Sequence, residues 1–355
     1  CGISSSLFSL AFAKIMKNCL CFTCIVLTAL LMKSCASNDD LLNPKIAFLS
    51  NRESPKGEFD IFISSLNDSI QFNLTKDLQF IRSISRPRLS PDNNSLLYVS
   101  FNENKKFLSL LDVMTKEHKY LTKVNVDLPN ASFIDSGRKI LYEKKVNGKK
   151  QMYILGVDGR VEENISSSPD ANEFNPKLSE DGTTLVFLKQ SNKATSIVIR
   201  NLRAEKEHVI KVNGNQINPS FWGENDIVYE SYVDGSYKIF TFKNKSGEVD
   251  QITTGGSNAN NPFIVNDGKS LVFVSDGRGR RFKDICLLDL ETKKFELVTK
   301  DLNYMNYNMS ILENREGIVF ESSSITDSEI YYLSLKDYSL TNISKNKAWD
   351  CQPSF

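Results

Sequence analysis

The sequence is poor in histidine throughout and in cysteine beyond its first 35 residues. In 355 residues it has two histidines, His118 and His208, and the cysteines beyond Cys35 are Cys286 and Cys351. Two separated histidines cannot supply the ligand cluster that a transition metal needs, and two cysteines are too few for a disulfide framework. We therefore predict no metal and no cofactor, and we expect the two late cysteines to be small buried residues rather than a disulfide.

Net charge, long apolar runs and common catalytic motifs are also scarce. The 44 Lys and Arg residues nearly balance the 43 Asp and Glu residues, giving a net charge of +1, so nucleic acid is not expected as a partner. Beyond the N-terminal segment, no apolar run reaches the ~20 residues that span a bilayer. Neither Gly-x-Ser-x-Gly nor Gly-x-x-x-x-Gly-Lys-Ser/Thr occurs. These absences favour a non-enzymatic protein over an enzyme.

The N-terminal segment is expected to be a targeting signal rather than part of the folded domain. From Met16 the chain has a short basic region, an apolar run over 20–32, and then Lys33-Ser34-Cys35. This order is typical of a secretory signal. The apolar run is shorter than the ~20 residues that a transmembrane helix needs. Because the chain starts with a cysteine, we interpret residues 1–15 as an upstream extension.

The segment around Cys35 resembles the cleavage site of bacterial lipoproteins, in which the cysteine is lipidated and becomes the first residue. Met32 and Lys33 depart from the usual pattern, so an ordinary cleaved signal and an uncleaved anchor stay as alternatives. The resemblance implies a protein of the bacterial cell envelope, attached to the outer membrane by its lipid and facing either the periplasm or the surface. It makes residues 16–34 a signal peptide and residues 35–43 a tether.

A repeat of about 44 residues runs through the rest of the chain. Its clearest marks are prolines that open the repeats: Pro87, Pro176, Pro219, Pro262 and Pro353. In two repeats another residue, Ala131 or Asn308, stands at the expected position of the proline, and the rest of the repeat is still recognisable. In the fullest copy we expect the inner strand to start at Pro176. A period in this range with four short strands is typical of a β-propeller.

The second strand of each repeat has aliphatic residues followed by an aromatic residue at one register. The seven copies centre on Phe48, Tyr98, Tyr142, Phe187, Tyr229, Phe273 and Phe320. Such apolar runs indicate strands that are buried on both faces, as between stacked blades.

We therefore predict an all-β β-propeller over residues 44–355, with seven four-stranded blades. Six blades are the alternative if the repeat over 131–175 is irregular. The chain enters at Lys45 with a second strand and ends at 352–355 with a first strand. The C-terminal strand is therefore expected to pair with the N-terminal blade and close the ring, which removes exposed strand edges.

The repeats resemble the TolB-like propeller family, whose unit carries a Pro-x-x-Ser-Pro-Asp-Gly turn. The closest copies are Pro87-Arg88-Leu89-Ser90-Pro91-Asp92 and Pro176-Lys177-Leu178-Ser179-Glu180-Asp181-Gly182, and Phe273 to Arg280 is similar to the family's strand-to-hairpin segment. The resemblance implies the propeller fold and leaves function open, because propellers host many functions. TolB itself carries a separate domain before its propeller, for which the tether leaves no room.

Carboxylates recur in one turn of the repeat, at Asp92, Asp135, Asp181 and Asp267. Recurrence in a turn argues for a structural role, since acid–base catalysis needs two carboxylates in unlike environments. An enzyme acting on acidic glycans, as a lyase or hydrolase, remains the alternative to a binding protein.

Strand order places the loops between second and third strands, and those between blades, on one rim of the ring. This rim collects basic residues, most densely over 278–283, and aromatic residues from the loops between blades. Aromatic and Arg residues together are typical of interface hot spots. We predict a partner-binding surface on this rim, formed by Arg278, Arg280, Arg281, Lys283, Tyr304, Tyr307 and Trp349.

The expected partner of this rim is a protein or an anionic glycan, bound by a monomer. The alternatives are a hairpin tip that only faces water and aromatic side chains that fill the central channel.

Overall fold

The computed structural model describes residues 45–355 apart from several short gaps. The gaps are 54–57, 67–69, 79–81, 84–86, 103–104, 123–130, 192–193, 211–213, 224, 280, 303 and 313–314. The predictions for the upstream extension, the signal peptide, the lipidation site Cys35 and the tether lie outside the described residues. No helix among the described residues is both long enough and apolar enough to cross a membrane.

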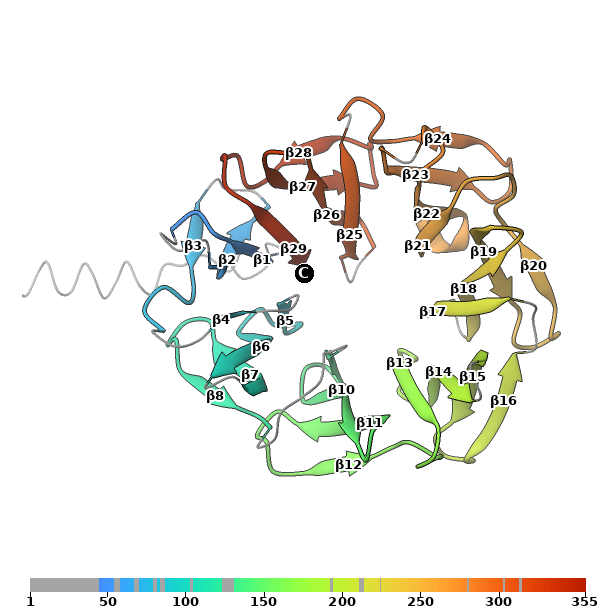
Figure 1. Ribbon diagram of the computed structural model, residues 1–355, viewed down its shortest axis with the longest axis horizontal. Helices are drawn as coiled ribbons and strands as arrows, with labels where there is room; N and C mark the ends of the chain where they lie inside the picture. Colours follow the sequence, from blue (N-terminus) through green and yellow to red (C-terminus); the bar gives the residue numbers. More distant parts are fainter. Residues whose placement is uncertain are drawn as a thin grey trace, which may run out of the picture. The chain divides into compact units, whose positions relative to one another are not determined.

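The segment from Pro44 to Phe355 is one compact unit, in which seven antiparallel sheets form a ring (Figure 1). We number these blades along the chain. Blade 1 contains β29 (Asp350–Ser354), β1 (Lys45–Ser50), β2 (Asp60–Ser65) and β3 (Gln71–Asn73). Blade 2 contains β4 (Arg82–Ser83), β5 (Arg88–Leu89), β6 (Ser95–Asn102), β7 (Lys105–Asp112) and β8 (His118–Tyr120). Blade 3 contains β9 (Ser132–Ile134), β10 (Lys139–Val146), β11 (Lys149–Gly156) and β12 (Glu162–Asn164).

The remaining four blades follow the chain without interruption. Blade 4 contains β13 (Asn172–Leu178), β14 (Thr184–Ser191), β15 (Ala194–Asn201) and β16 (Lys206–Ile210). Blade 5 contains β17 (Asn215–Trp222), β18 (Asp226–Val233), β19 (Ser236–Phe242) and β20 (Val249–Gln251). Blade 6 contains β21 (Ala259–Val265), β22 (Ser270–Ser275), β23 (Asp284–Asp289) and β24 (Phe295–Leu297). Blade 7 contains β25 (Met305–Ile311), β26 (Gly317–Ser323), β27 (Ser328–Ser334) and β28 (Leu340–Asn342).

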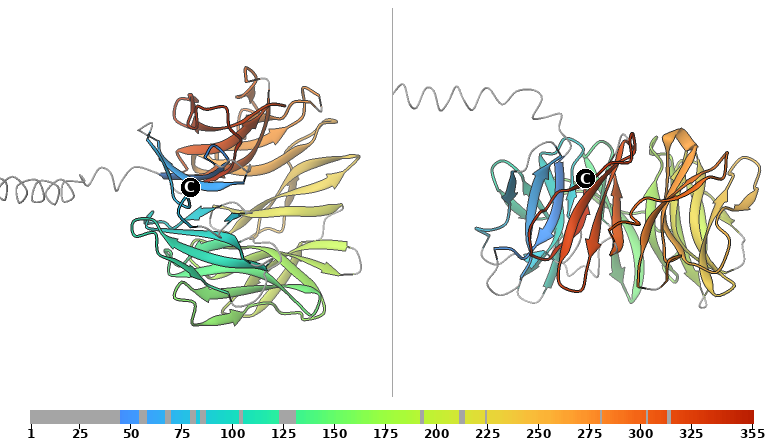
Figure 2. Two further views of the ribbon diagram at one scale, coloured as in Figure 1. Left: turned by 60° about the vertical axis from the view of Figure 1, so that its left-hand side comes forward. Right: turned by 90° about the horizontal axis from the view of Figure 1, so that it is seen from above.

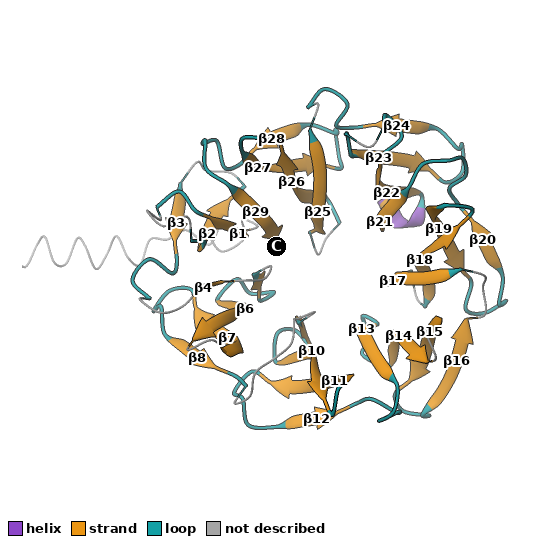
Figure 3. Ribbon diagram, viewed as in Figure 1, coloured by secondary structure: helices purple, strands orange, loops and turns teal. Residues whose placement is uncertain are grey.

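These sheets confirm the predicted seven-bladed propeller and rule out six blades, since the repeat over 131–175 contains a complete blade 3. Figure 3 shows strands in every blade and one short helix among the described residues, the 3₁₀ turn η1 (Asn266–Gly268) of blade 6. Figure 2 shows the blades from two further sides, with the hairpin loops gathered at the two rims.

The ring closes through the C-terminal strand, as predicted. β29 pairs antiparallel with β1, with Ala47 opposite Ser354 and Ser50 opposite Asp350. The buried Asp350 carboxylate then accepts a hydrogen bond at 3.0 Å from the guanidinium of Arg52, which follows β1. The first blade is therefore built from both ends of the propeller segment.

The core lies between neighbouring blades and is built on the second strands. The seven predicted aromatic residues of these strands are at most 4% exposed. In one cluster Leu97 and Val99 of blade 2 pack with Ile140 and Tyr142 of blade 3. Cys286 is buried on β23 and Cys351 is half-buried on β29, and both thiols are free.

A side-chain hydroxyl just after the fourth strand satisfies a buried backbone N–H of the third strand in six blades. The acceptors Thr75, Thr122, Ser166, Thr253, Thr299 and Ser344 bind the N–H groups of Ile61, Leu108, Met152, Ile239, Ile285 and Ile330 at 2.8–3.1 Å. In blade 4 the side chain of Gln216, from blade 5, accepts from the N–H of Ile197 at 2.8 Å. The ladder therefore depends on a hydroxyl that recurs at one position of the repeat, at the end of the fourth strand.

Four inner strands, β13, β17, β21 and β29, begin before the proline of their repeat and continue through it, which the prediction did not include. β13 begins at Asn172, four residues before the predicted start at Pro176, and its register shifts between Phe174 and Lys177. This shift is a β-bulge, which inserts one extra residue and bends the strand. The bulged residue has a positive φ, which asparagine tolerates better than most residues.

The same bulge recurs in five blades. Its residues with positive φ are Asn175, Asn218, Asn261, Asn308 and Gln352, at 50–54°. The position of the proline in blade 7 is consequently held by Met309 rather than by Asn308, as the predicted repeat had it, because Ser310 pairs with Val319 as Lys177 pairs with Val186.

Three buried glutamates hold the bulges of neighbouring blades. Glu143 accepts from the N–H of Asn175 at 2.6 Å, Glu230 from that of Asn261 at 2.8 Å, and Glu321 from that of Gln352 at 3.1 Å. Each glutamate follows the aromatic residue of a second strand and is at most 3% exposed. The carboxylate thus satisfies a backbone donor that the bulge leaves out of its own ladder.

We expect the substitution Thr253→Val to destabilise the propeller by about 1–3 kcal/mol, because the buried N–H of Ile239 would lose its acceptor without a change in side-chain shape. The free energy of unfolding in urea measures this effect. The exposed strand residue Thr341 provides the control, since Thr341→Val should change stability by less than about 0.5 kcal/mol. Equal stabilities for the two variants would contradict the role of the hydroxyl.

A second prediction concerns pH. Burial raises the pKa of Glu230 above its ordinary value of 4.5, against the opposing effect of hydrogen bonds from Asn260, Asn218 and Asn261. A carboxyl group that holds its proton more tightly in the folded state carries no penalty below its unfolded pKa, and the penalty grows as pH rises towards the folded value.

The wild type should therefore lose stability relative to Glu230→Gln as the pH rises above about 4.5. Unfolding free energies of both proteins at pH 4 and at pH 8 test this. A stability difference that is the same at both pH values, or that shifts in favour of the wild type, would refute it.

Candidate binding surface on the rim of blades 6, 7 and 1

The hairpins between second and third strands and the loops between blades share one rim, as predicted. Two backbone bridges show this directly. Lys283, in the hairpin of blade 6, pairs with Met305 at the start of blade 7, and Ser328 of blade 7 pairs with Trp349 ahead of β29. We call this side of the ring the hairpin rim.

A continuous row of paired backbone crosses the hairpin rim from blade 6 to blade 1. Lys283 pairs with Met305, Met305 with Ser323, Ser323 with Ser328, and Ser328 with Trp349. The ladder therefore holds together loops that are distant in the sequence, and it brings Lys283 and Trp349 onto the two sides of blade 7.

Beyond Trp349 the row reaches blade 1. The N–H of Trp349 donates to the side-chain oxygen of Asn51 at 3.0 Å, and the N–H of Asn51 donates to the carbonyl of Trp349 at 3.4 Å. The backbone that carries Trp349 is thus fixed on both sides.

Four large apolar side chains are exposed along this row. Tyr304 is 40% exposed, Met305 37%, Ile325 at the hairpin tip of blade 7 99%, and Trp349 37%. Many other exposed apolar side chains lie on outer strands of different blades, such as Phe72, Tyr120 and Phe295. We call the surface formed by Tyr304, Met305, Ile325 and Trp349 the blade 7 patch.

Arg278, the first of the predicted binding residues, is engaged in an ion pair within its own hairpin. Its Nε lies 2.6 Å from Oδ2 of Asp284, and its Nη2 lies 2.7 Å from Oδ1. The guanidinium also lies 4.9 Å from the ring centre of Phe282. The Asp284 side chain is only 1% exposed, and its hydrogen bonds raise the pKa of Arg278.

Lys283 lies between blade 6 and blade 7, where its Nζ is 5.9 Å from the ring centre of Tyr307. This distance is within reach of a cation–π attraction. The Tyr307 hydroxyl shares a hydrogen bond of 2.9 Å with Oγ of Ser323, and burial raises the pKa of Tyr307 to about 12. Tyr307 is therefore a neutral, fixed wall beside the lysine.

The structure brings only part of the predicted surface together. Lys283, Tyr304 and Tyr307 meet at the boundary of blades 6 and 7, whereas Trp349 lies at the next boundary. Arg281 is exposed on the blade 6 hairpin, and Arg280 lies outside the described residues.

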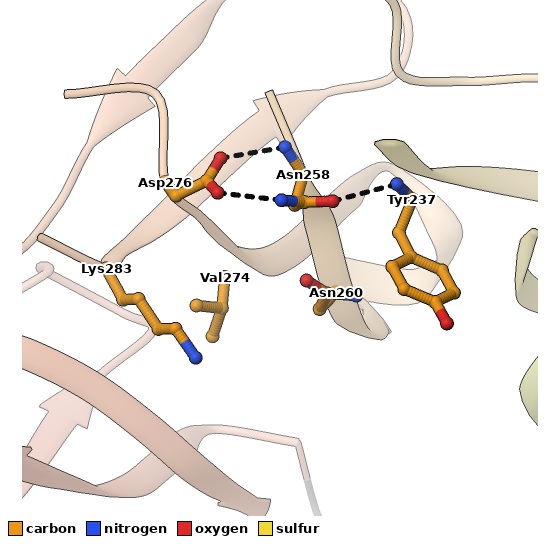
Figure 4. A pocket seen from close by; sticks show the side chains of 6 residues that line it. All are labelled: Tyr237, Asn258, Asn260, Val274, Asp276 and Lys283. Carbon is orange, nitrogen blue, oxygen red and sulfur yellow. Dashed lines mark hydrogen bonds between the residues drawn. The ribbon is translucent and has the colours of Figure 1, made fainter. Parts of the chain in front are cut away.

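A pocket of about 270 Å³ opens beside Lys283, between blades 5 and 6. Figure 4 shows Lys283 and Tyr237 on its two sides, with Val274 and Asn260 between them and Asp276 next to Asn258. Sequence reasoning missed this pocket, because its lining is spread over four segments that the propeller brings together.

An asparagine clamp holds the wall of the pocket. Asn258 Oδ1 accepts from the N–H of Tyr237 at 2.9 Å, and Asn258 Nδ2 donates to Oδ2 of Asp276 at 2.7 Å. The N–H of Asn258 also donates to Oδ1 of Asp276 at 2.8 Å. Below them, Asn260 Nδ2 donates to Oε2 of the buried Glu230 at 2.6 Å.

The clamp has a copy between blades 3 and 4, which a search of the sequence for paired positions could have found. Asn172 Oδ1 accepts from the N–H of Lys150 at 2.9 Å, and Asn172 Nδ2 donates to Gln190 at 3.2 Å. The spacing from the asparagine to its partner is 18 residues in both places.

The aspartates on the opposite rim confirm their expected structural role in two turns. Asp92 accepts from Ser90 and Asn94, and Asp181 accepts from Ser179 and Thr183. The hydrogen bonds from the two serines hold the pKa of each carboxyl group below its ordinary value. These side chains shape the turns of their hairpins.

The two histidines lie on the outer strands β8 and β16 of different blades. Across the described parts of the chain, no group of three or more His, Cys, Asp and Glu side chains is placed to hold a metal ion.

We expect Arg278→Met to destabilise the protein by about 3 kcal/mol, because it leaves the buried carboxylate of Asp284 without its cation. Arg281→Met is the matched control, since Arg281 is exposed on the same hairpin and its loss should change stability by less than about 0.5 kcal/mol. Unfolding in urea measures both. A loss of stability that is as small for Arg278→Met as for the control would show that the ion pair has no structural role.

Comparison with known proteins supports the resemblance that the repeats suggested. Residues 170–283 match the profile of the TolB β-propeller domain. A protein TolB homolog of Chlorobium chlorochromatii (strain CaD3) is 24% identical over 140 residues, which are 39% of this chain and 31% of that relative. The match thus spans about a third of the relative's length.

Solved structures agree with this result at the level of the fold. TolB from Acinetobacter baumannii has a TM-score of 0.55 at 16% identity, over 84% of this chain and 78% of that one. An oligogalacturonate lyase in complex with manganese has a TM-score of 0.64 at 13% identity, over 85% of both chains. At such identities the likeness shows the fold alone: the chain is a β-propeller, and residues 170–283 are similar to the TolB β-propeller domain.

Proposed function

We propose that this chain is a non-enzymatic propeller of the bacterial cell envelope that binds an acidic protein partner through the blade 7 patch. The observation that carries the proposal is the exposure of Tyr304, Met305, Ile325 and Trp349 on one backbone row beside two basic residues. Exposed apolar and aromatic side chains gathered in one place are typical of a surface that a partner covers.

Charge around the patch favours an acidic partner. Arg281 is exposed on the blade 6 hairpin, and Lys345 and Lys347 are exposed in the loop that leads to Trp349. Asp301 and Asp327 lie among them, and the Asp327 carboxylate already accepts from Ser324. Such complementarity raises the rate of association and selects among partners more than it adds affinity.

The fixed backbone favours binding by a preformed surface. The row from Lys283 to Trp349 is paired at every step, so the side chains on it need little ordering when a partner arrives. Lys283 contributes through its position over Tyr307, whereas Arg278 supports the hairpin through Asp284.

The envelope location rests on the predicted signal over residues 16–34 and on lipidation of Cys35, through which the protein would be anchored as a monomer in the outer membrane. The similarity to TolB homologs is consistent with a bacterial origin. Mass spectrometry of the protein purified from membranes would test the anchor, with a Cys35→Ser variant as the control. A lipidated cysteine at the N-terminus supports it, and an unmodified chain starting elsewhere overturns it.

We expect the double variant Arg281→Glu/Lys283→Glu and the single variant Trp349→Ala each to lose a protein that wild type captures from envelope extracts. Capture should also weaken as salt concentration rises, because exposed charges are screened. Arg278 is left unchanged in this test, since its reversal would disturb Asp284 rather than the partner.

The matched control carries the same charge change on the opposite rim, as Lys269→Glu/Lys294→Glu, where both lysines are exposed. If this control loses the captured protein as well, net charge and not the blade 7 patch is responsible. Identical capture by all variants would place the partner elsewhere on the ring.

A second candidate is an enzyme acting on acidic glycans, because the fold similarity to the oligogalacturonate lyase extends over most of both chains. Incubation of the purified protein with polygalacturonate, followed by analysis of chain length, separates the two functions. Shortened chains would favour the enzyme, and unchanged chains would leave the binding function as the better explanation.

A further inference from the structure

We propose that the pocket between blades 5 and 6 binds a small hydroxy acid, meaning a carboxylate that carries neighbouring hydroxyl groups, such as a sugar acid. The pocket is lined by Tyr237, Asn258, Asn260, Val274, Asp276 and Lys283 (Figure 4). It shares only Lys283 with the proposed partner surface, and it stands without the proposed function.

The walls of this pocket are fixed before any ligand arrives. Asn258 is bonded to the backbone of Tyr237 on one side and to the carboxylate of Asp276 on the other. Asn260 is held from below by Glu230. A site with polar groups already in place does not lose binding free energy to ordering them.

Lys283 supplies the positive charge for a carboxylate. Its side chain is half-buried at the mouth of the pocket, and the Tyr307 ring lies 5.9 Å from its Nζ. Figure 4 shows the ammonium group on the side of the pocket that faces Val274 and Asn260. Charge-assisted hydrogen bonds to a carboxylate are about twice as strong as neutral ones, and they fix the direction of the ligand.

The opposite side of the pocket supplies acceptors for hydroxyl groups. Asn260 gives its amide N–H to Glu230, so its carbonyl oxygen is the part of the amide left to accept from a ligand. Each Asp276 oxygen takes one hydrogen bond from Asn258, and a carboxylate oxygen has a second lone pair for another donor. These acceptors suit a ligand with O–H groups and disfavour a second anion.

The size and the apolar parts of the pocket fit a compact ligand. Its volume of about 270 Å³ lies just below the roughly 300–1,000 Å³ of drug-sized sites. The Tyr237 ring and Val274 offer carbon surface between the polar groups. A single small unit with polar edges and a carbon face matches this combination.

The copy of the clamp between blades 3 and 4 forms a second pocket of about 280 Å³, lined by Lys145, Gly148, Lys150, Asn172, Phe174 and Gln190. By strand pairing, Phe174 and Gln190 occupy the positions of Asn260 and Asp276. This pocket keeps lysines but replaces the two acceptors by a ring and a neutral amide. It therefore offers hydroxyl groups one neutral acceptor, the Gln190 amide, where the first pocket offers an amide and a carboxylate.

Three probes separate the two halves of the recognition: glucuronate carries both groups, glucose carries only hydroxyls, and propionate carries only the carboxylate. Isothermal titration calorimetry with the full-length protein should show binding of glucuronate. Glucose and propionate should each bind at least about tenfold more weakly, which corresponds to loss of one charged or two neutral hydrogen bonds. Equal binding of all three, or no binding of glucuronate up to 10 mM as a working limit, would overturn the proposal.

Two variants locate the binding. Lys283→Gln removes the charge, and Asn260→Leu fills the pocket at a position where Phe174 and Ile217 show that the fold accepts an apolar side chain. Each should weaken glucuronate binding by at least about tenfold. Lys294→Gln, an exposed lysine on the opposite rim, should leave the affinity unchanged. Affinity that is unchanged in both pocket variants would place the binding elsewhere and overturn the proposal.

The Trp349→Ala variant distinguishes this proposal from the partner surface. It should lose the captured protein and keep its affinity for glucuronate, because Trp349 lies at the boundary of blades 7 and 1 and does not line the pocket. Loss of glucuronate binding in this variant would show that the pocket is not an independent site.

Discussion

The packing of the inner strands depends on one hydrogen-bond donor, the backbone N–H of the bulged residue. A bulge takes this group out of its own ladder, and a buried N–H without an acceptor destabilises a fold by about 1–3 kcal/mol. At three boundaries the acceptor is a glutamate of the preceding blade: Glu143, Glu230 or Glu321. One contact thus satisfies the N–H of the bulge and joins the second strand of one blade to the innermost strand of the next. The remaining bulges, in blades 5 and 7, place Asn218 and Asn308 so that their side chains bond to the same carboxylates.

The pocket between blades 5 and 6 follows from this arrangement. Because the bulge fixes the residue before it, Asn260 stands directly over Glu230 and donates to it. One half of its amide thereby holds the blades together, and the other half is left for the pocket. Support for the fold and recognition of a ligand are in this way two roles of a single side chain.

The sequence was sufficient to predict the architecture of the propeller, but it was not sufficient to predict the side-chain contacts of the candidate site. The repeat, the aromatic residues of the second strands and the closing C-terminal strand were all predictable, because burial on two faces leaves a strong pattern. The inner strands were not, since a bulge hides the continuation of a strand beyond its proline. Arg278 looked like a free binding residue because its partner Asp284 lies across a hairpin whose shape the sequence does not show. The pocket was missed for the same reason, as its charge and its acceptors come from different strands.

The two clamps show why function in this fold is decided at the boundaries between blades. Asn172 and Asn258 make the same contacts to backbone, so the frame of each pocket is constant. Two of the residues that face the space differ between the pockets: Phe174 stands where Asn260 does, and Gln190 stands where Asp276 does. Both Phe174 and Asn260 are compatible with the bulge that follows them. The side chains that face a pocket between two blades can therefore differ while the backbone of the propeller stays the same. The backbone of the bulges cannot change so freely, because its N–H groups need the buried carboxylates as acceptors.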